Sequence, residues 1–241
     1  MKKITTVFIL LTLSFSIFAG VGDSNFDHSS WDKLLQKHVS VKGNVNYDGF
    51  KADKQVLDAY LTSLSKNSPA SNWSKNDVMA YWINAYNAFT VKLILNNYPV
   101  KSIMDINGGK AWDLKFIKLG GKEYSLNNIE HGILRKRYKD ARIHFAVNCA
   151  SVSCPKLANS AFTAADLEKQ LEKMSKEFID NSSKNTVQTN ELKISSLFDW
   201  YKDDFITSGG SVISFINRYS NIKASQGSNV SFKEYNWNLN K

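Results

Sequence analysis

The side chains best suited to chemistry gather in the middle of this 241-residue chain. They are Glu130, His131, His144, Cys149 and Cys154. A cysteine attacks as its thiolate, so it needs a neighbouring group that lowers its pKa. Cys149 is therefore a candidate catalytic nucleophile, with His131 or His144 as its base. Glu130 would be the carboxylate that orients the histidine.

The same residues allow two other roles. Cys149 and Cys154 can form a local disulfide in an oxidising compartment, provided that a turn brings their Cα atoms within about 7 Å. The two cysteines with His131 and His144 also make four possible Zn²⁺ ligands, but their spacing matches no familiar zinc pattern. No Gly-rich phosphate loop is present. We expect no metal and no cofactor.

The flanking elements must bring these side chains together. Glu130 and His131 lie on a helix that Ser125 can cap. Residues 142–148 alternate in a way that predicts a strand, with His144 on one face. Cys149 would then follow the strand end, where free backbone N–H groups could stabilise an oxyanion.

A second set of polar residues belongs to a long apolar segment. A capping box starts at Ser74, and residues 78–95 leave almost no polar face, which predicts a buried central helix. Asn84 and Asn87 then lie among apolar neighbours and need hydrogen-bond partners. They either bridge a backbone turn or line a site, and Asn148 is a third candidate for lining it.

The remaining patterns indicate the fold class. Amphipathic helices are predicted near residues 31–38, 56–64 and 163–180, hairpins at 116–124 and 186–194, short helices at 198–205 and 212–219, and a last strand at 230–235. Helices and hairpins mix without regular βαβ alternation. We therefore expect an α+β single domain in which a buried central helix packs against a small, mostly antiparallel sheet with surrounding helices.

The first residues predict export. Lys2 and Lys3 precede an apolar run, residues 4–18, which ends at the small residue Ala19. This is the pattern of a secretory signal peptide at residues 1–19. The run is shorter than the roughly 20 residues that a bilayer span requires, so we expect no permanent membrane span. Residues 20–241 would then form one globular domain in the periplasm or outside the cell.

The net charge of +9 is spread over many short segments. Such a distribution usually serves solubility and marks no basic tract. An exported chain is also separated from nucleic acid, so we expect none as a partner. The expected partner is an envelope or extracellular ligand, which the sequence does not specify.

Four motifs resemble the domain-of-unknown-function family 547. They are Tyr-Trp-Ile-Asn-Ala-Tyr-Asn-Ala at 81–88, Leu-Asn-Asn-Ile-Glu-His-Gly-Ile-Leu-Arg at 126–135, His-Phe-Ala-Val-Asn-Cys-Ala-Ser-Val-Ser-Cys-Pro at 144–155, and Trp-Tyr-Lys-Asp-Asp-Phe at 200–205. The likeness runs over residues 45–240, approximately. It implies an exported bacterial domain and brings no settled activity or catalytic assignment.

Two functions are compatible with these observations. The first is a thiol-dependent hydrolase or acyltransferase of the envelope that uses Cys149 with a histidine and Glu130. The second is a non-catalytic binding or scaffolding domain that a structural Cys149–Cys154 disulfide holds together. Whether the chain is an enzyme therefore depends on how these side chains meet.

We predict that the mature protein begins at Gly20, because the basic start, the apolar run and Ala19 fit the signal-peptidase pattern. N-terminal sequencing of protein collected outside the cytoplasm should read from Gly20. Recovery of a soluble cytoplasmic pool that retains Met1 would contradict the prediction.

Overall fold

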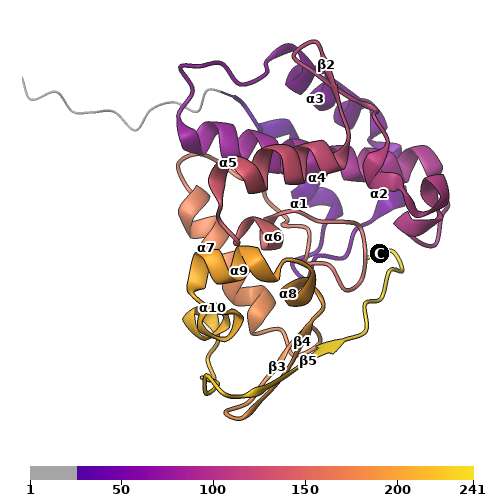
Figure 1. The fold of residues 1–241 in the computed structure, drawn as a ribbon. Coiled ribbons are helices and arrows are strands. Elements are labelled where there is room, and N and C mark those ends of the chain that lie inside the picture. The colour runs from indigo at the N-terminus through magenta and orange to yellow at the C-terminus, as the bar shows by residue number, and fades with distance from the viewer. Residues whose placement is uncertain (1–25) are drawn as a thin grey trace, which may run out of the picture.

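One helix is buried along almost its whole length. The computed structural model describes residues 26–241, so the predicted leader lies outside the described residues. Helix α4 (Lys75–Asn97) runs through the upper half of the molecule (Figure 1) and buries nearly every residue from Asp77 to Leu95. Ser74 caps it by accepting a hydrogen bond from the N–H of Asp77. The predicted central helix is confirmed.

Helices surround α4 in the first half of the chain. They are α1 (Ser29–His38), α2 (Tyr47–Ala52), α3 (Lys54–Lys66), the short 3-10 helices η1 (Ile103–Gly109) and η2 (Ala111–Asp113), the π-helix η3 (Asn128–Arg135) and α5 (Lys136–Tyr138). Helix α4 packs mainly against α2, α3 and η3. A hairpin of β1 (Ile117–Leu119) and β2 (Lys122–Tyr124) adds an aromatic contact, because the rings of Trp82 and Tyr124 lie 5.4 Å apart.

The second half of the chain forms the lower part of the molecule (Figure 1). Its helices are α7 (Leu167–Ile179), α8 (Leu197–Trp200), α9 (Lys202–Gly209) and α10 (Val212–Tyr219). Its strands are β3 (Thr186–Val187), β4 (Glu191–Ser195) and β5 (Asn229–Lys233). Strands β3 and β4 pair antiparallel, and β5 pairs parallel to β4. Helices with two small sheets make the fold α+β, as predicted, but α4 packs mainly against helices and not against a sheet.

The strand predicted at residues 142–148 is wrong. The structure forms a short helix there, α6 (Ile143–Ala146), which lies between the two halves of the molecule (Figure 1). Both faces of this segment are buried, so the alternation of residue types carried no signal of an exposed face. A short apolar run of this kind fits a strand or a buried helix equally well. Phe145 anchors α6 by packing against Phe178 and Phe205.

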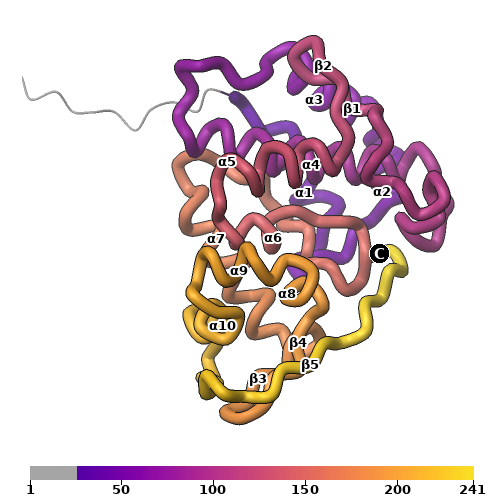
Figure 2. Tube along the Cα trace, in the orientation of Figure 1, coloured from indigo at the N-terminus to yellow at the C-terminus, as the bar shows by residue number. Residues whose placement is uncertain are grey.

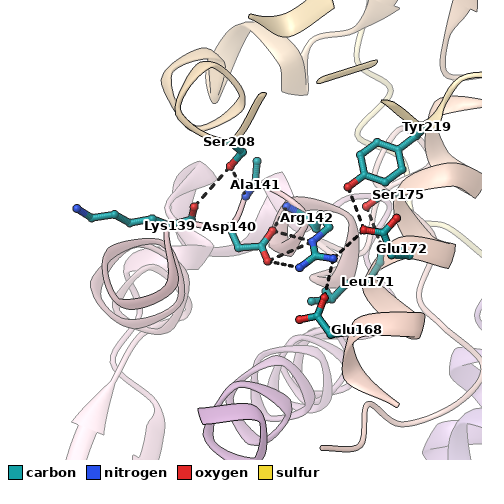
Figure 3. Close-up of polar contacts among 10 residues, drawn as sticks. All are labelled: Lys139, Asp140, Ala141, Arg142, Glu168, Leu171, Glu172, Ser175, Ser208 and Tyr219. Atoms are coloured by element: carbon teal, nitrogen blue, oxygen red, sulfur yellow. Dashed lines mark hydrogen bonds and ion pairs between the residues drawn. The ribbon is translucent and has the colours of Figure 1, made fainter. Parts of the chain in front are cut away.

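Arg142 fixes the start of α6 (Figure 3). Its guanidinium binds Asp140 at 2.6 Å and reaches two carboxylates of α7, Glu168 at 2.9 Å and Glu172 at 2.8 Å. The half-buried guanidinium thus has carboxylates on several sides, which is the arrangement that its fork of N–H donors favours. The ion pairs join α6 to α7 and so fix the direction of the residues that follow.

The end of the chain returns to the middle of the molecule. After β5 the chain runs back up along the opposite side from α10 (Figure 2). There it lies against the loop from Cys149 to Cys154, called the cysteine loop. The N–H of Val152 donates to the carbonyl of Asn238 at 2.8 Å, and the N–H of Ser153 donates to the carbonyl of Asn236 at 3.1 Å. The C-terminal segment therefore forms one side of the cysteine loop's surroundings.

Among residues 26–241, no helix combines the length and the apolar character needed to cross a bilayer.

We predict that Trp82→Ala lowers the free energy of unfolding by about 3–5 kcal/mol, because it removes a large aromatic side chain from a packed core. Trp82 is 7% exposed and contacts two tyrosine rings. Denaturant unfolding measures the change. Ile222→Ala, at a side chain 53% exposed, is the control and should stay within about 0.5 kcal/mol of the parent. A loss below about 1 kcal/mol for Trp82→Ala would contradict the packing of α4.

Candidate functional site

A cavity of about 190 Å³ collects most of the reactive side chains. Its aromatic lining is Tyr86, Trp112, Trp200, Tyr201, Tyr235 and Trp237. Its ionisable lining is Glu130, His131, His144, Cys149 and Cys154. The sequence therefore identified the correct region, since all five predicted ionisable residues border one cavity.

Asn87 on α4 sets the path of the chain as it leaves α6. Its amide donates to the carbonyl of Ala146 at 2.9 Å and accepts from the N–H of Asn148 at 2.8 Å. Asn84 forms the same kind of bridge, because its amide both donates to and accepts from the backbone of Phe162. Both asparagines thus bridge backbone segments, one of the two roles that the sequence left open.

Asn148 closes the cysteine loop on itself. Its side-chain nitrogen donates to the carbonyl of Pro155 at 2.7 Å, and its oxygen accepts from the N–H of Ala150 at 2.9 Å. Ala150 has a φ of 60°, a left-handed conformation that few residues other than glycine adopt without cost. The sharp turn at this position brings Cys149 and Cys154 together.

The two cysteine sulfurs lie 2.7 Å apart, and both cysteines are free. The disulfide that the sequence left open as an alternative is therefore not formed in the structure. The N–H of Cys149 also donates to the sulfur of Cys154 at 2.9 Å. Two hydroxyl groups complete the surroundings of the Cys149 sulfur: Ser151 Oγ at 3.4 Å and Tyr235 OH at 3.3 Å.

These contacts shift the pKa values of the two thiols in opposite directions. Burial would raise the pKa of Cys149, but hydrogen bonds with Cys154, Ser151 and Tyr235 outweigh burial and bring that pKa below its ordinary value. Burial and the adjacent Cys149 sulfur hold the pKa of Cys154 well above its ordinary value. Cys149 is therefore the thiol that ionises first, and Cys154 remains protonated beside it.

Glu130 does not orient a histidine. It is buried on η3, and its two carboxylate oxygens accept hydrogen bonds from the hydroxyls of Tyr86 and Tyr201, each at 2.9 Å. Burial, followed by the charge of Glu130, raises the pKa of both tyrosines, so their hydroxyls remain donors. The predicted role of Glu130 is replaced by a tyrosine clamp that holds the carboxylate at the cavity wall.

Asp204 on α9 is the carboxylate that orients His144. Its Oδ2 lies 2.7 Å from Nε2 of His144, and Arg135 binds both of its oxygens, at 2.6 and 3.0 Å. Burial would raise the pKa of Asp204, but these hydrogen bonds outweigh burial and lower it. Asp204 is thus ionised and accepts a hydrogen bond from Nε2 of His144.

Nδ1 of His144 is buried and has no hydrogen-bond partner among residues 26–241. The ring stacks on Tyr201 with centroids 3.9 Å apart. The other predicted base, His131, is exposed and pairs through Nδ1 with Arg135 at 3.1 Å. Within the described residues neither histidine hydrogen-bonds Cys149, so the predicted thiol–histidine pair is not formed.

Asp204 and Tyr235 were both missed as site residues. The motif around Asp204 contains no signal of a contact with a histidine 60 residues earlier. The pattern at residues 230–235 predicts a strand and does not indicate that Tyr235 lies beside Cys149. In the described part of the chain, no group of three or more histidine, cysteine or acidic side chains is placed to hold a metal ion.

Comparison with known proteins relates the middle of the chain to one family. A family model described as "Protein of unknown function, DUF547" matches residues 70–179. This range spans α4, the tyrosine-clamped Glu130 and the cysteine loop, and it is similar to that family, as the motifs indicated. Comparisons with curated proteins and with solved structures gave no match.

We predict that Tyr235→Phe raises the pKa of Cys149 by about one pH unit, because it removes a hydrogen bond to the thiolate. The thiolate absorbance of the fully reduced protein, followed against pH, measures this pKa. Tyr219→Phe removes a hydroxyl that bonds Glu172 instead and should leave the titration unchanged. An unchanged pKa in Tyr235→Phe would mean that this hydroxyl does not stabilise the thiolate.

Proposed function

We propose that this protein is a thiol–disulfide oxidoreductase, in which Cys149 attacks a substrate disulfide and Cys154 resolves the product. The observation that carries the proposal is the contact between two free sulfurs at the wall of a cavity. A structural pair would need neither the cavity nor the hydroxyl groups that lie beside the Cys149 sulfur.

The exchange proceeds in two balanced steps. The Cys149 thiolate attacks one sulfur of the substrate disulfide, the substrate S–S bond breaks, and the departing thiolate takes a proton from solvent. A mixed disulfide then joins Cys149 to the substrate. Cys154 loses its proton and attacks the Cys149 sulfur, which releases the second substrate thiolate. Two electrons pass to the substrate, and an external thiol reductant restores the dithiol.

The order of the two steps follows from the pKa directions. Cys154 stays protonated while Cys149 carries negative charge, because the neighbouring charge opposes its ionisation. Once Cys149 is bonded to the substrate sulfur, that charge is gone and the pKa of Cys154 falls. The second thiol is therefore released for attack only after the first has reacted.

We also propose export, to the periplasm or beyond the cell, on the pattern of residues 1–19. In an oxidising compartment a dithiol would persist only if a reductant is supplied there. A binding domain held together by a Cys149–Cys154 disulfide would contain the same pair in its oxidised state. The two functions therefore differ in whether this disulfide forms reversibly.

Acyl transfer or hydrolysis is a second candidate function. It is favoured by the Asp204–His144 pair and by the buried Nδ1 of His144 that has no partner among the described residues. A base must come within hydrogen-bond reach of the nucleophile. Within the described residues, His144 stacks on Tyr201 and forms no hydrogen bond with Cys149, whereas the Cys154 sulfur lies 2.7 Å from the Cys149 sulfur.

We predict that the reduced protein exchanges with 2-hydroxyethyl disulfide, a small uncharged substrate, and ends with a Cys149–Cys154 disulfide. Mass spectrometry without reductant should show the loss of two hydrogens and no lasting adduct. Cys154→Ser should instead accumulate a mixed disulfide on Cys149, and Cys149→Ser should not react at a comparable rate.

His144→Gln separates the two candidate functions. Disulfide exchange does not use this ring, so its rate should change little if the dithiol is the reactive unit. A loss of about a hundredfold or more in the reactivity of Cys149 would instead assign His144 as its base and favour acyl transfer. A wild-type protein that keeps a stable mixed disulfide on Cys149 would contradict the oxidoreductase.

A further inference from the structure

The cavity combines aromatic walls with negative charge. Three tryptophans border it, and Trp200 and Trp237 lie nearly parallel, with centroids 5.8 Å apart and 12° between their planes. The carboxylate of Glu130 and the sulfur of Cys149 belong to the same lining. An anionic group surrounded by aromatic rings is unusual for a site that binds a neutral apolar ligand, because burying a charge without a partner is costly.

In the described part of the chain, Glu130 has no lysine or arginine as an ion-pair partner. The bonds of Glu130 come from two neutral tyrosine hydroxyls, and no lysine or arginine among residues 26–241 forms an ion pair with it. The nearest candidate, Arg135, stacks over Tyr201 at 5.0 Å but gives two hydrogen bonds to Asp204. Glu130 therefore places in the lining a carboxylate that a cationic ligand can complement.

We propose that the cavity binds an organic cation, such as a primary or quaternary ammonium group, and that the substrate of the dithiol carries this group. Tryptophan and tyrosine faces attract ammonium cations through the charge distribution of their rings. Glu130 supplies the formal counter-charge within the same lining. The substrate class rests on the proposed oxidoreductase, whereas cation binding itself does not.

The dimensions of the site fit a small headgroup. A volume of about 190 Å³ is below that of a typical drug-sized pocket. Trp200 is 48% exposed, so one wall of the cavity is open to an entering ligand. A cation held against this wall would lie in the same cavity as Cys149, where an attached disulfide can meet the thiolate.

Choline and its uncharged isostere 3,3-dimethylbutan-1-ol test the binding of a cation without any redox step. Both probes have the same shape, so a difference between them reports charge alone. Choline should change the tryptophan fluorescence saturably and slow the alkylation of Cys149 by iodoacetamide. The neutral alcohol should bind about tenfold more weakly.

Three variants assign the effect to the cavity. Glu130→Gln keeps the shape of the side chain and should weaken choline binding by about tenfold, since it removes the counter-charge. Trp200→Leu keeps an apolar surface without an aromatic face and should weaken it too, while Trp200→Phe should retain most of it. Glu123→Gln changes an exposed carboxylate on the β1–β2 hairpin and serves as the matched control, with unchanged binding.

The substrate class is tested with cystamine, in which an ammonium group replaces each hydroxyl of 2-hydroxyethyl disulfide. The protein's rate of exchange with cystamine is divided by its rate with the neutral disulfide. Dividing this ratio by the same ratio for a free small thiol corrects for the intrinsic reactivity of the two disulfides. This normalised preference should be about tenfold and should be lost in Glu130→Gln.

The outcomes separate this inference from the proposed function. Equal binding of choline and the alcohol, or no binding of either, would overturn the cation site even if the neutral disulfide oxidises the dithiol. Choline binding that depends on Glu130, in a protein whose dithiol does not react, would support the site and contradict the oxidoreductase. Binding with no normalised preference for cystamine would overturn the cationic substrate.

Discussion

Where the chain leaves α6, the side-chain amide of Asn87 bonds the carbonyl of Ala146 and the N–H of Asn148. These backbone groups are buried, and leaving one of them without a partner would cost about 1–3 kcal/mol. Asn87 can serve both because α4 is enclosed on all sides and holds the amide in place. The central helix therefore sets the path of the cysteine loop, and the reactive sulfur depends on a residue that does not line the cavity.

Local patterns predicted most of the elements. The cap at Ser74, the all-apolar helix after it and the Gly120–Gly121 hairpin follow from short-range geometry, which a single sequence contains. Helix α6 did not follow in this way. Its residues are buried on both faces. The sequence there lacks the regularly spaced polar residues that distinguish a strand from a helix.

The composition of the site was predictable, but its pairings were not. Glu130, both histidines and both cysteines border one cavity, as their density in the sequence indicated. Their partners, however, come from distant segments: Tyr86 and Tyr201 for Glu130, and Asp204 for His144. Such contacts are set by how α4, η3, α6 and α9 pack together, and no local spacing records them.

A thiolate that relies on neutral donors differs from one paired with a histidine. The donors around Cys149 lower its pKa without adding positive charge to the cavity. Glu130 then supplies the negative charge within the aromatic lining. The same arrangement thus accounts for the reactivity of the sulfur and for the kind of ligand that the cavity would accept. The reactivity depends on Cys149 and Cys154 acting as a reversible pair, whereas cation binding does not.

The reduction potential of that pair tests this account most directly. The native protein would be equilibrated in buffers of defined thiol and disulfide composition, and the fraction with a Cys149–Cys154 bond measured after acid quenching. A redox-active dithiol should give one reversible two-electron transition between about −270 and −120 mV. A potential below about −300 mV would indicate a structural disulfide, and failure to form the bond at all in the folded protein would equally contradict the oxidoreductase.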